Sequence, residues 1–337
     1  MFRSKSIIVQ PSAVARVLQN RGCCGVDGIP VQTLTDNHAG FLANLQSQLQ
    51  TDSYLPLPLR SAQIESTCEG RHKLRQLAIP NLADRLLATQ ARSDLQPLAE
   101  SRFEEASHGY RTLRGVATAL ASLARIRQEG FRFILDADIV AFFDSIPHDP
   151  LLKTFTYWFS ARNRWAPLLS LWLSRPLWNG RHLLPARRGI AQGCPLSPLL
   201  ANLYLHSLDE VIRSHGWRMV RYADDFLVLT RSSNDLDLAH QIVSVWLGSA
   251  GLRLHPGKTH LRPPEASFPF LGHLIHQGLP CGPLARIRTS RLRNIAPIWT
   301  AADFHRFGYS TANGFTAKSI QEELSWLQWL NPTRFFT

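Results

Sequence analysis

The sequence predicts an α+β fold in which a small sheet carries three carboxylates at one end. Residues 218–229 read as two apolar strands with Tyr222-Ala223-Asp224-Asp225 between them, which places two adjacent acids at the tip of a β-hairpin. Residues 131–138 read as another strand, rich in aromatic and branched side chains, that ends in Asp138. Neighbouring anions repel and Asp is depleted in strands, so this arrangement indicates a bound divalent cation.

Taken alone, Asp224-Asp225 also fits an exposed turn, because Asp is a common turn residue. The addition of Asp138 changes the interpretation. Two strands that deliver acids to one point can hold two Mg²⁺ ions for nucleotidyl transfer, with Mn²⁺ as a substitute.

The composition favours a polyanionic partner. The chain has 337 residues with 37 Lys+Arg against 25 Asp+Glu, a formal charge of +12, and only five of its cations are lysines. Arginine suits bidentate contact with phosphate, although a genomic preference for Arg codons explains the Arg/Lys ratio equally well. Codon preference does not explain the net charge, which indicates nucleic acid.

The cysteines and the N-terminus bear on the compartment. Five cysteines are odd in number and include no C-x-x-C pair, so neither a disulfide framework nor a zinc module is predicted. The apolar stretch Ile7-Ile8-Val9 is too short for a signal peptide, and no apolar window of about 20 residues follows. We therefore expect a soluble, cytoplasmic protein without a membrane partner.

The rest of the chain reads as one continuous enzyme of two or three subdomains without internal repeats. Helices are expected over residues 11–22, 84–105, 197–215 and 235–250. Residues 71–80 alternate basic or polar with apolar side chains, like a strand with one face toward an anion. In the block around Gln192-Gly193, Ser197 is placed to cap the following helix, and the block by itself fits a plain loop-to-helix transition.

The order of these segments resembles bacterial reverse transcriptases of the group II intron lineage, over roughly residues 12–276. The motifs that carry the resemblance are Gly25-Val26-Asp27-Gly28, Lys73 through Pro80, His108-Gly109-Tyr110-Arg111, Asp138 with Phe142-Phe143-Asp144, Gln192-Gly193 with Ser197-Pro198, Tyr222-Ala223-Asp224-Asp225, Gly251-Leu252 through Lys258-Thr259, and Phe270-Leu271-Gly272.

The resemblance implies a right-hand polymerase with fingers, palm and a short helical thumb. We expect an N-terminal extension and fingers over residues 1–130, a palm over 131–276 with a helical insertion near 150–185, and an Arg/Trp-rich thumb-like segment over 277–337. The arginines expected along a duplex, or else on a solvated helix face, are Arg286, Arg288, Arg291 and Arg293, with Trp299, Trp326 and Trp329 nearby.

The resemblance also implies a metal centre. Asp138 and Asp224 match the metal-binding carboxylates, and Asp225 matches a less direct third. The backbone carbonyl of Ile139 matches a further ligand. Lys258 matches a lysine that donates a proton to pyrophosphate, although an ordinary surface lysine remains an alternative.

The substrate-binding roles come from the same resemblance. Lys73 and Arg75 match the cations that grip the dNTP triphosphate, which requires charge-assisted contacts. Phe143 matches the bulky side chain beneath the sugar that leaves no room for a 2′-hydroxyl, with a core position as the alternative. Gln192 and Gly193 match residues that lie against the template and the nascent base pair.

The branch of the family is less sharply indicated. The sequence of residues 188–205 is most similar to reverse transcriptases associated with CRISPR adaptation modules. This resemblance suggests that the enzyme copies RNA for a partner integrase. A group II intron-type reverse transcriptase or maturase, a noncatalytic RNA-binding protein of the same fold and another templated polymerase stay open. The expected partners are an RNA template, a DNA or RNA primer and dNTPs.

Overall fold

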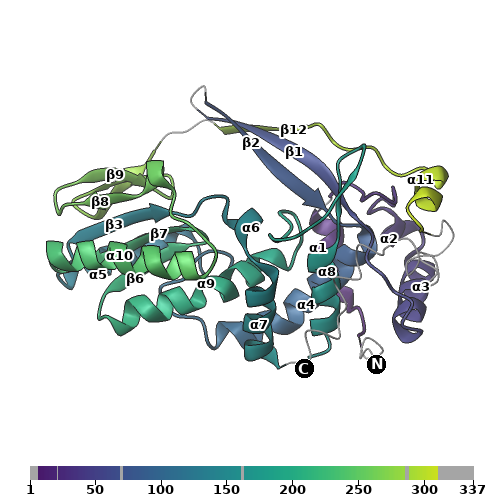
Figure 1. The fold of residues 1–337 in the computed structure, drawn as a ribbon, viewed down its shortest axis with the longest axis horizontal. Coiled ribbons are helices and arrows are strands. Elements are labelled where there is room, and N and C mark those ends of the chain that lie inside the picture. The colour runs from purple at the N-terminus through teal and green to yellow at the C-terminus, as the bar shows by residue number, and fades with distance from the viewer. Residues whose placement is uncertain (1–6, 21, 69–70, 161–162, 285–287, 310–337) are drawn as a thin grey trace.

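The computed structural model describes residues 7–20, 22–68, 71–160, 163–284 and 288–309. They form a palm built on one sheet, and a second region of helices with a long β-ribbon above it (Figure 1). None of the helices in this described part combines the length and the apolar character that a bilayer crossing requires.

The palm sheet is antiparallel with the strand order β6-β7-β3-β8. Its strands are β3 (Phe133–Asp138), β6 (Arg218–Tyr222), β7 (Asp225–Thr230) and β8 (His260–Arg262). Every residue of β7 after Asp225 is buried, so this strand is covered on both faces, as its uninterrupted apolar run predicts.

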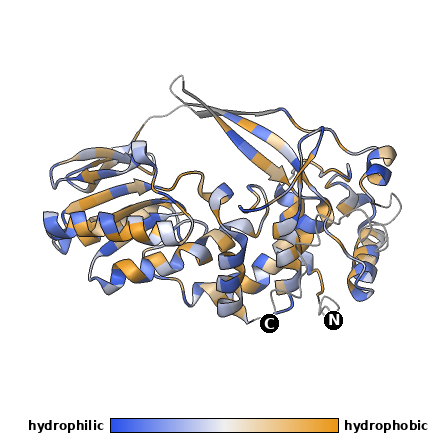
Figure 2. Ribbon diagram, in the orientation of Figure 1, coloured by the Kyte–Doolittle hydropathy of each residue, from blue (hydrophilic) through white to orange (hydrophobic). Residues whose placement is uncertain are grey.

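The two faces of the sheet pack against different helices. Phe226 and Val228 belong to the main core with α9 (Ser197–Ser214) and α10 (Ser233–Ser249). Leu227 and Leu229 belong to a second core with α5 (Val116–Gln128). This alternation follows from the two-residue period of a strand and fixes the register of the hairpin. Figure 2 shows hydrophobic and hydrophilic segments alternating along these helices.

The helix α9 begins at the predicted residue but is capped differently. Its N-cap position is Leu196, and Ser197 makes no capping bond to the helix backbone. The hydroxyl of Ser197 instead donates to the carbonyl of Ala191 at 2.8 Å, which closes the loop that precedes the helix. The prediction that Ser197 caps the helix is therefore wrong, because its side chain points back into the loop.

The remaining helices lie mainly in the second region, and short strands join them. The helices are α1 (Pro11–Asn20), α2 (Thr33–Asp36), α3 (His38–Gln50), α4 (Leu82–Glu100), α6 (Phe142–Ser145), α7 (His148–Phe159) and α8 (Ala166–Ser174). The short strands β4 (Leu177–Trp178) and β5 (Leu183–Leu184) complete this part. The 3₁₀ turn η2 (Pro256–Lys258) belongs to the palm, where it precedes β8 and contacts β3.

The ribbon above the palm contains the segment predicted to face an anion. Strands β1 (Leu59–Cys68) and β2 (Arg71–Ile79) form an antiparallel hairpin, with Gln63 opposite Gln76. A third strand, β12 (Arg288–Arg293), pairs with the other edge of β1 (Figure 1). As a result, β1 is an interior strand and its backbone is bonded on both sides.

The described residues after 276, in the segment expected to form a short helical thumb, contain more strand than helix. A small sheet of β9 (Ser267–Phe270), β10 (His273–His276) and β11 (Leu279–Pro283) is followed by β12 and then α11 (Ala301–Arg306). The expected duplex-binding residues Arg288, Arg291 and Arg293 thus lie on a strand beside β1. Arg286, Trp326 and Trp329 lie outside the described residues.

Trp299 packs in a buried aromatic cluster next to the ribbon. It is 5% exposed, and its backbone N–H donates to the Val26 carbonyl at 2.7 Å. Its ring contacts Trp178 edge-on at 6.1 Å, and the Trp178 Nε1–H donates to the carbonyl of Pro297 at 3.0 Å. Burial of this aromatic cluster stabilises the packing of Pro297 and Trp299 against Val26 and Trp178.

Candidate active site

Three predicted acids meet at one end of the palm sheet. Asp138 is the last residue of β3 and lies directly opposite Asp225, the first residue of β7. Asp225 also pairs with Tyr222, so Ala223 and Asp224 form the two-residue turn of the hairpin. Ala223 adopts a left-handed conformation with φ +60°, which a tight hairpin turn of this type requires.

The electrostatics of this strand end are dominated by burial and like charge. The pKa of Asp225 is raised to about 7, first by burial and then by the nearby carboxylates of Asp136, Asp138 and Asp224. The ammonium of Lys258 acts in the opposite direction. A site in which carboxylates repel one another in this way is stabilised by an added cation.

Lys258 supplies a positive charge at the same point. Its Nζ lies 2.6 Å from Oδ2 of Asp138. The turn η2 brings it there, because the backbone N–H of His255 donates to the Asp138 carbonyl at 2.8 Å and that of Val140 donates to the Arg253 carbonyl at 2.9 Å. These two bonds also fix the backbone on either side of Ile139, whose side chain is buried.

Phe143 lies on the short helix α6, just after the end of β3. Its side chain is half-buried, whereas the neighbouring Phe142 is 2% exposed and belongs to the main core. The two rings meet edge-to-face at 5.6 Å. Ala141 precedes them with φ +42°, and this left-handed residue turns the chain sharply from the strand into the helix.

Gln192 and Gly193 connect the palm to the ribbon. The carbonyl of Gln192 accepts a bond from the Ala78 N–H of β2 at 2.9 Å, and its side-chain amide lies 3.3 Å from both oxygens of Asp144. Gly193 has φ +123°, and a Cβ at this position would lie 3.1 Å from the Ala78 carbonyl oxygen. Glycine is needed there both for the conformation and for the close approach.

The predicted triphosphate cations lie on β2. Lys73 pairs with Ser66 across the ribbon, and its side chain is outside the described atoms. Arg75 is exposed. The pKa of the Tyr110 hydroxyl is raised, first by burial and then by the charges of Asp224 and Tyr222. The positive charge of Arg75 acts in the opposite direction.

Tyr110 belongs to the His108-Gly109-Tyr110-Arg111 motif, but no role at the site was predicted for it. It has φ +61°, and its ring centroid lies 6.4 Å from that of Tyr222. The preceding Gly109 packs against the hairpin so closely that a Cβ would lie 2.6 Å from the Ala223 nitrogen. The signal in the sequence was Gly109, because a glycine in such a motif permits a close backbone approach.

The donor atoms are of the chemical type that suits a hard divalent cation. Asp138, Asp224 and Asp225 offer carboxylate oxygens, and the Ile139 carbonyl offers a backbone oxygen, which are the ligands that Mg²⁺ and Mn²⁺ prefer. Within the described residues no three acidic, His or Cys side chains enclose a cation, and Lys258 holds one oxygen of Asp138.

Residues 66–275 match the reverse transcriptase (RNA-dependent DNA polymerase) family, and the chain belongs to this family. Protein YkfC of Escherichia coli K12 is 27% identical over 88% of this chain and 89% of its own length. The group II intron-encoded protein LtrA of Lactococcus lactis is 31% identical over 183 residues, which are 53% of this chain and 30% of LtrA.

The solved structure of telomerase from Candida albicans is similar at the level of fold. Its TM-score is 0.51 with 16% identity, over 66% of this chain and 44% of telomerase. The predictions of an α+β reverse transcriptase fold and of an RNA-directed DNA polymerase family are confirmed by these similarities.

The fit of the carboxylates to Mg²⁺ can be measured without a reaction. We expect Mg²⁺ to raise the melting temperature of the protein, because a cation that binds only the folded state at ten times its Kd stabilises that state by about 1.4 kcal/mol. Asp224→Asn is expected to lose most of this shift in differential scanning fluorimetry. Asp149→Asn, an exposed acid at the start of α7, serves as the control and keeps the shift. An unchanged shift in Asp224→Asn would show that Mg²⁺ binds elsewhere.

Proposed function

We propose that this protein is an RNA-directed DNA polymerase that extends a DNA or RNA primer on an RNA template with dNTPs. The observation that carries the proposal is the register of the palm sheet, which sets Asp138 opposite Asp225 and beside the Tyr222–Asp225 turn. Family membership and the formal charge of +12 agree with a nucleic-acid substrate.

In this proposal, Asp138 and Asp224 would hold two Mg²⁺ ions, with Asp225 as a less direct ligand and the Ile139 carbonyl as a further one. When bound, the ions lower the pKa of the primer 3′-hydroxyl and neutralise charge on the pyrophosphate. The 3′-hydroxyl would release its proton to water, and its oxygen would form a bond to the α-phosphorus of the dNTP while the bond from that phosphorus to the bridging oxygen of pyrophosphate breaks.

Other residues of the chain bind and orient the reactants. The charges of Lys73 and Arg75 lie on β2, the ribbon strand bonded to the palm through Ala78 and Gln192, and would hold the triphosphate. The Nζ of Lys258 lies beside Asp138 at the end of β3. From there Lys258 would donate a proton to the leaving pyrophosphate. Gln192 and Gly193 would lie against the template and the new base pair.

Phe143 would exclude ribonucleotides. Its half-buried ring follows the strand end that carries Asp138, and the Phe142 ring packs against it edge-to-face. A ring fixed in this way leaves no room for a 2′-hydroxyl on the incoming sugar.

The catalytic role of the hairpin is tested by primer extension on poly(rA)/oligo(dT) with dTTP. Asp224→Asn is expected to reduce the rate by more than about 100-fold, because loss of residues that only support a metal ligand already reduces activity by 10–100-fold. Binding of the primer-template, measured by fluorescence anisotropy, should stay unchanged, since Asp224 contacts no phosphate in this proposal. Retained extension in Asp224→Asn would refute the assignment, and no extension by the unmodified protein in Mg²⁺ or Mn²⁺ would indicate an RNA-binding protein.

The role of Phe143 is tested by the choice between dTTP and UTP. Phe143→Ala is expected to lower the preference for dTTP by about tenfold or more, as expected when a pocket loses the group that excludes one substituent. Phe143→Tyr keeps the ring and is the matched control. An unchanged sugar preference in Phe143→Ala would assign this residue to the core instead.

The finer proposal is that the enzyme copies RNA for storage by a CRISPR integrase complex. What supports it is the resemblance of the sequence of residues 188–205 to CRISPR-associated reverse transcriptases. This segment contains the Gln192-Gly193 turn and the first half of α9. A role in intron splicing is the alternative, and the similarity to LtrA spans 30% of that protein. Adaptation genes beside the coding gene would support the CRISPR role, and an intron boundary in their place would favour the maturase.

A further inference from the structure

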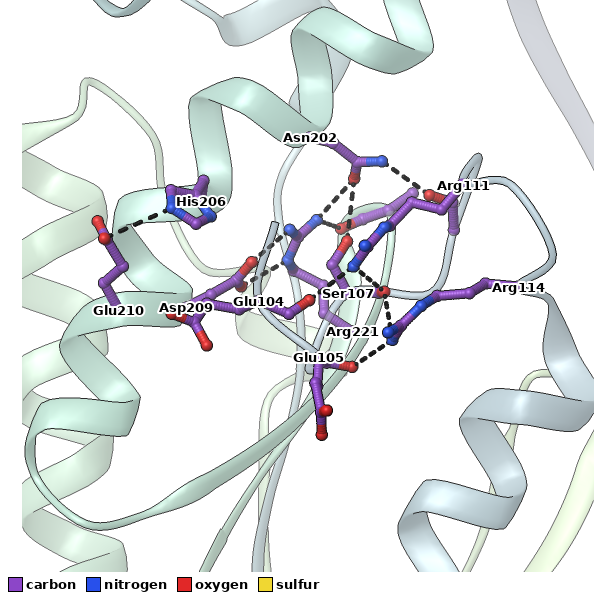
Figure 3. Close-up of polar contacts among 12 residues, drawn as sticks. Glu104, Glu105, Ser107, Arg111, Arg114, Asn202, His206, Asp209, Glu210 and Arg221 are labelled. Atoms are coloured by element: carbon purple, nitrogen blue, oxygen red, sulfur yellow. Dashed lines mark hydrogen bonds and ion pairs between the residues drawn. The ribbon is translucent and has the colours of Figure 1, made fainter. Parts of the chain in front are cut away.

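The catalytic hairpin rests on a buried charged cluster below its turn. Arg221 is the residue of β6 before Tyr222, and its side chain is fully buried. Its Nε and Nη2 donate to the two carboxylate oxygens of Asp209 at 2.8 and 2.6 Å. Figure 3 shows this pair between β6 and the helix α9, which carries Asp209.

The remaining nitrogen of Arg221 reaches the turn itself. Nη1 donates to the Ala223 carbonyl at 3.2 Å and to Oδ1 of Asn202 at 2.9 Å. The Ala223 carbonyl belongs to the peptide that enters Asp224. The guanidinium therefore holds the left-handed residue of the turn from below, one residue before the predicted metal ligand.

Asn202 extends the cluster to the other side of the hairpin. Its Nδ2 donates to the Gly109 carbonyl at 2.7 Å, and Gly109 packs against the Ala223 nitrogen. The backbone of Arg221 is also bonded to the same loop, since its N–H donates to Ala106 at 2.7 Å and its carbonyl accepts from His108 at 2.8 Å. Helix α9 and residues 106–109 thus clamp the hairpin from two directions.

Stability alone does not require this cluster. A buried ion pair is often no better for stability than well-packed apolar side chains of similar volume, because both ions lose their hydration. What the guanidinium offers is a rigid fork whose donors have fixed directions, which lysine lacks. Here the fork joins one carboxylate, one amide and one backbone carbonyl at a turn whose conformation needs support.

We propose that Arg221, held by Asp209 and Asn202, is the positioning residue of the catalytic carboxylates: it fixes the Ala223 peptide and so places Asp224 for metal binding. This inference rests on the proposed polymerase function. Arg221 itself is buried and touches neither metal nor substrate, so it acts through the hairpin.

The test compares two buried arginines. Arg221→Lys keeps the positive charge beside Asp209 but cannot reproduce the fork, so we expect kcat to fall and the Mg²⁺ concentration for half-maximal extension to rise, each by about tenfold or more. KM for dTTP and Kd for the primer-template should stay unchanged. Arg175→Lys is the matched control, because Arg175 is 4% exposed and lies 3.0 Å from Asp84, outside the hairpin contacts. It should leave kcat and the Mg²⁺ midpoint unchanged.

A second variant separates positioning from folding. Arg221→Met combined with Asp209→Leu removes both charges and keeps an apolar filling, so urea unfolding should remain cooperative while extension and its Mg²⁺ midpoint change as in Arg221→Lys. Extension like that of the unmodified protein in either folded variant would overturn the inference. So would failure of both variants to fold, because the cluster would then serve stability. An unmodified protein that does not extend the primer would instead contradict the proposed function.

Discussion

Repulsion among carboxylates at the ends of β3 and β7 is the constraint on which the rest of the site depends. Asp136 and Asp138 stand two residues apart on β3, and Asp225 lies opposite Asp138. Each of these two carboxylates on β3 forms an ion pair with a residue from later in the chain. Arg262 of the edge strand β8 lies 2.9 Å from Asp136, and Lys258 of η2 lies 2.6 Å from Asp138. The pKa of Asp225 is nevertheless raised to about 7, first by burial and then by the carboxylates of Asp136, Asp138 and Asp224.

The same strand end also concentrates unusual backbone conformations. Ala223, Tyr110 and Ala141 are non-glycine residues with positive φ, and all three flank the carboxylates. Such residues are unfavourable by about 1 kcal/mol or more and persist only where the surroundings over-determine them. Around Ala223 that support is visible as the Arg221 guanidinium below and Gly109 alongside. Charge and strain are therefore gathered at one point, and the buried polar cluster beneath it holds both in place.

The strands that carry Asp138 and Asp225 could be predicted from the sequence, because alternation of apolar residues and the position of the acids at strand ends are local signals. The sequence was insufficient where a partner comes from a distant part of the chain. The pairing of β12 with β1 joins Gln63 to Arg293, and no periodicity in either segment specifies it. Arg221 looked like one more cation of an Arg-rich chain, and only the fold shows that it is buried against Asp209. A buried arginine such as Arg221 adds to the net charge of the chain but is not available to bind nucleic acid.

The geometry between the triphosphate cations and the carboxylates follows from one more contact. The strand that carries Lys73 and Arg75 is fixed to the palm where the Ala78 N–H meets the Gln192 carbonyl. Gly193 lets the two backbones approach, since any other residue would meet the Ala78 carbonyl at 3.1 Å and adopt a strained φ. Gln192 also bonds to Asp144, on the helix that carries Phe143. The side chains proposed to bind the phosphates, the base pair and the sugar are therefore positioned by a single junction, and a shift of the ribbon at Ala78 would be transmitted to the Gln192 turn.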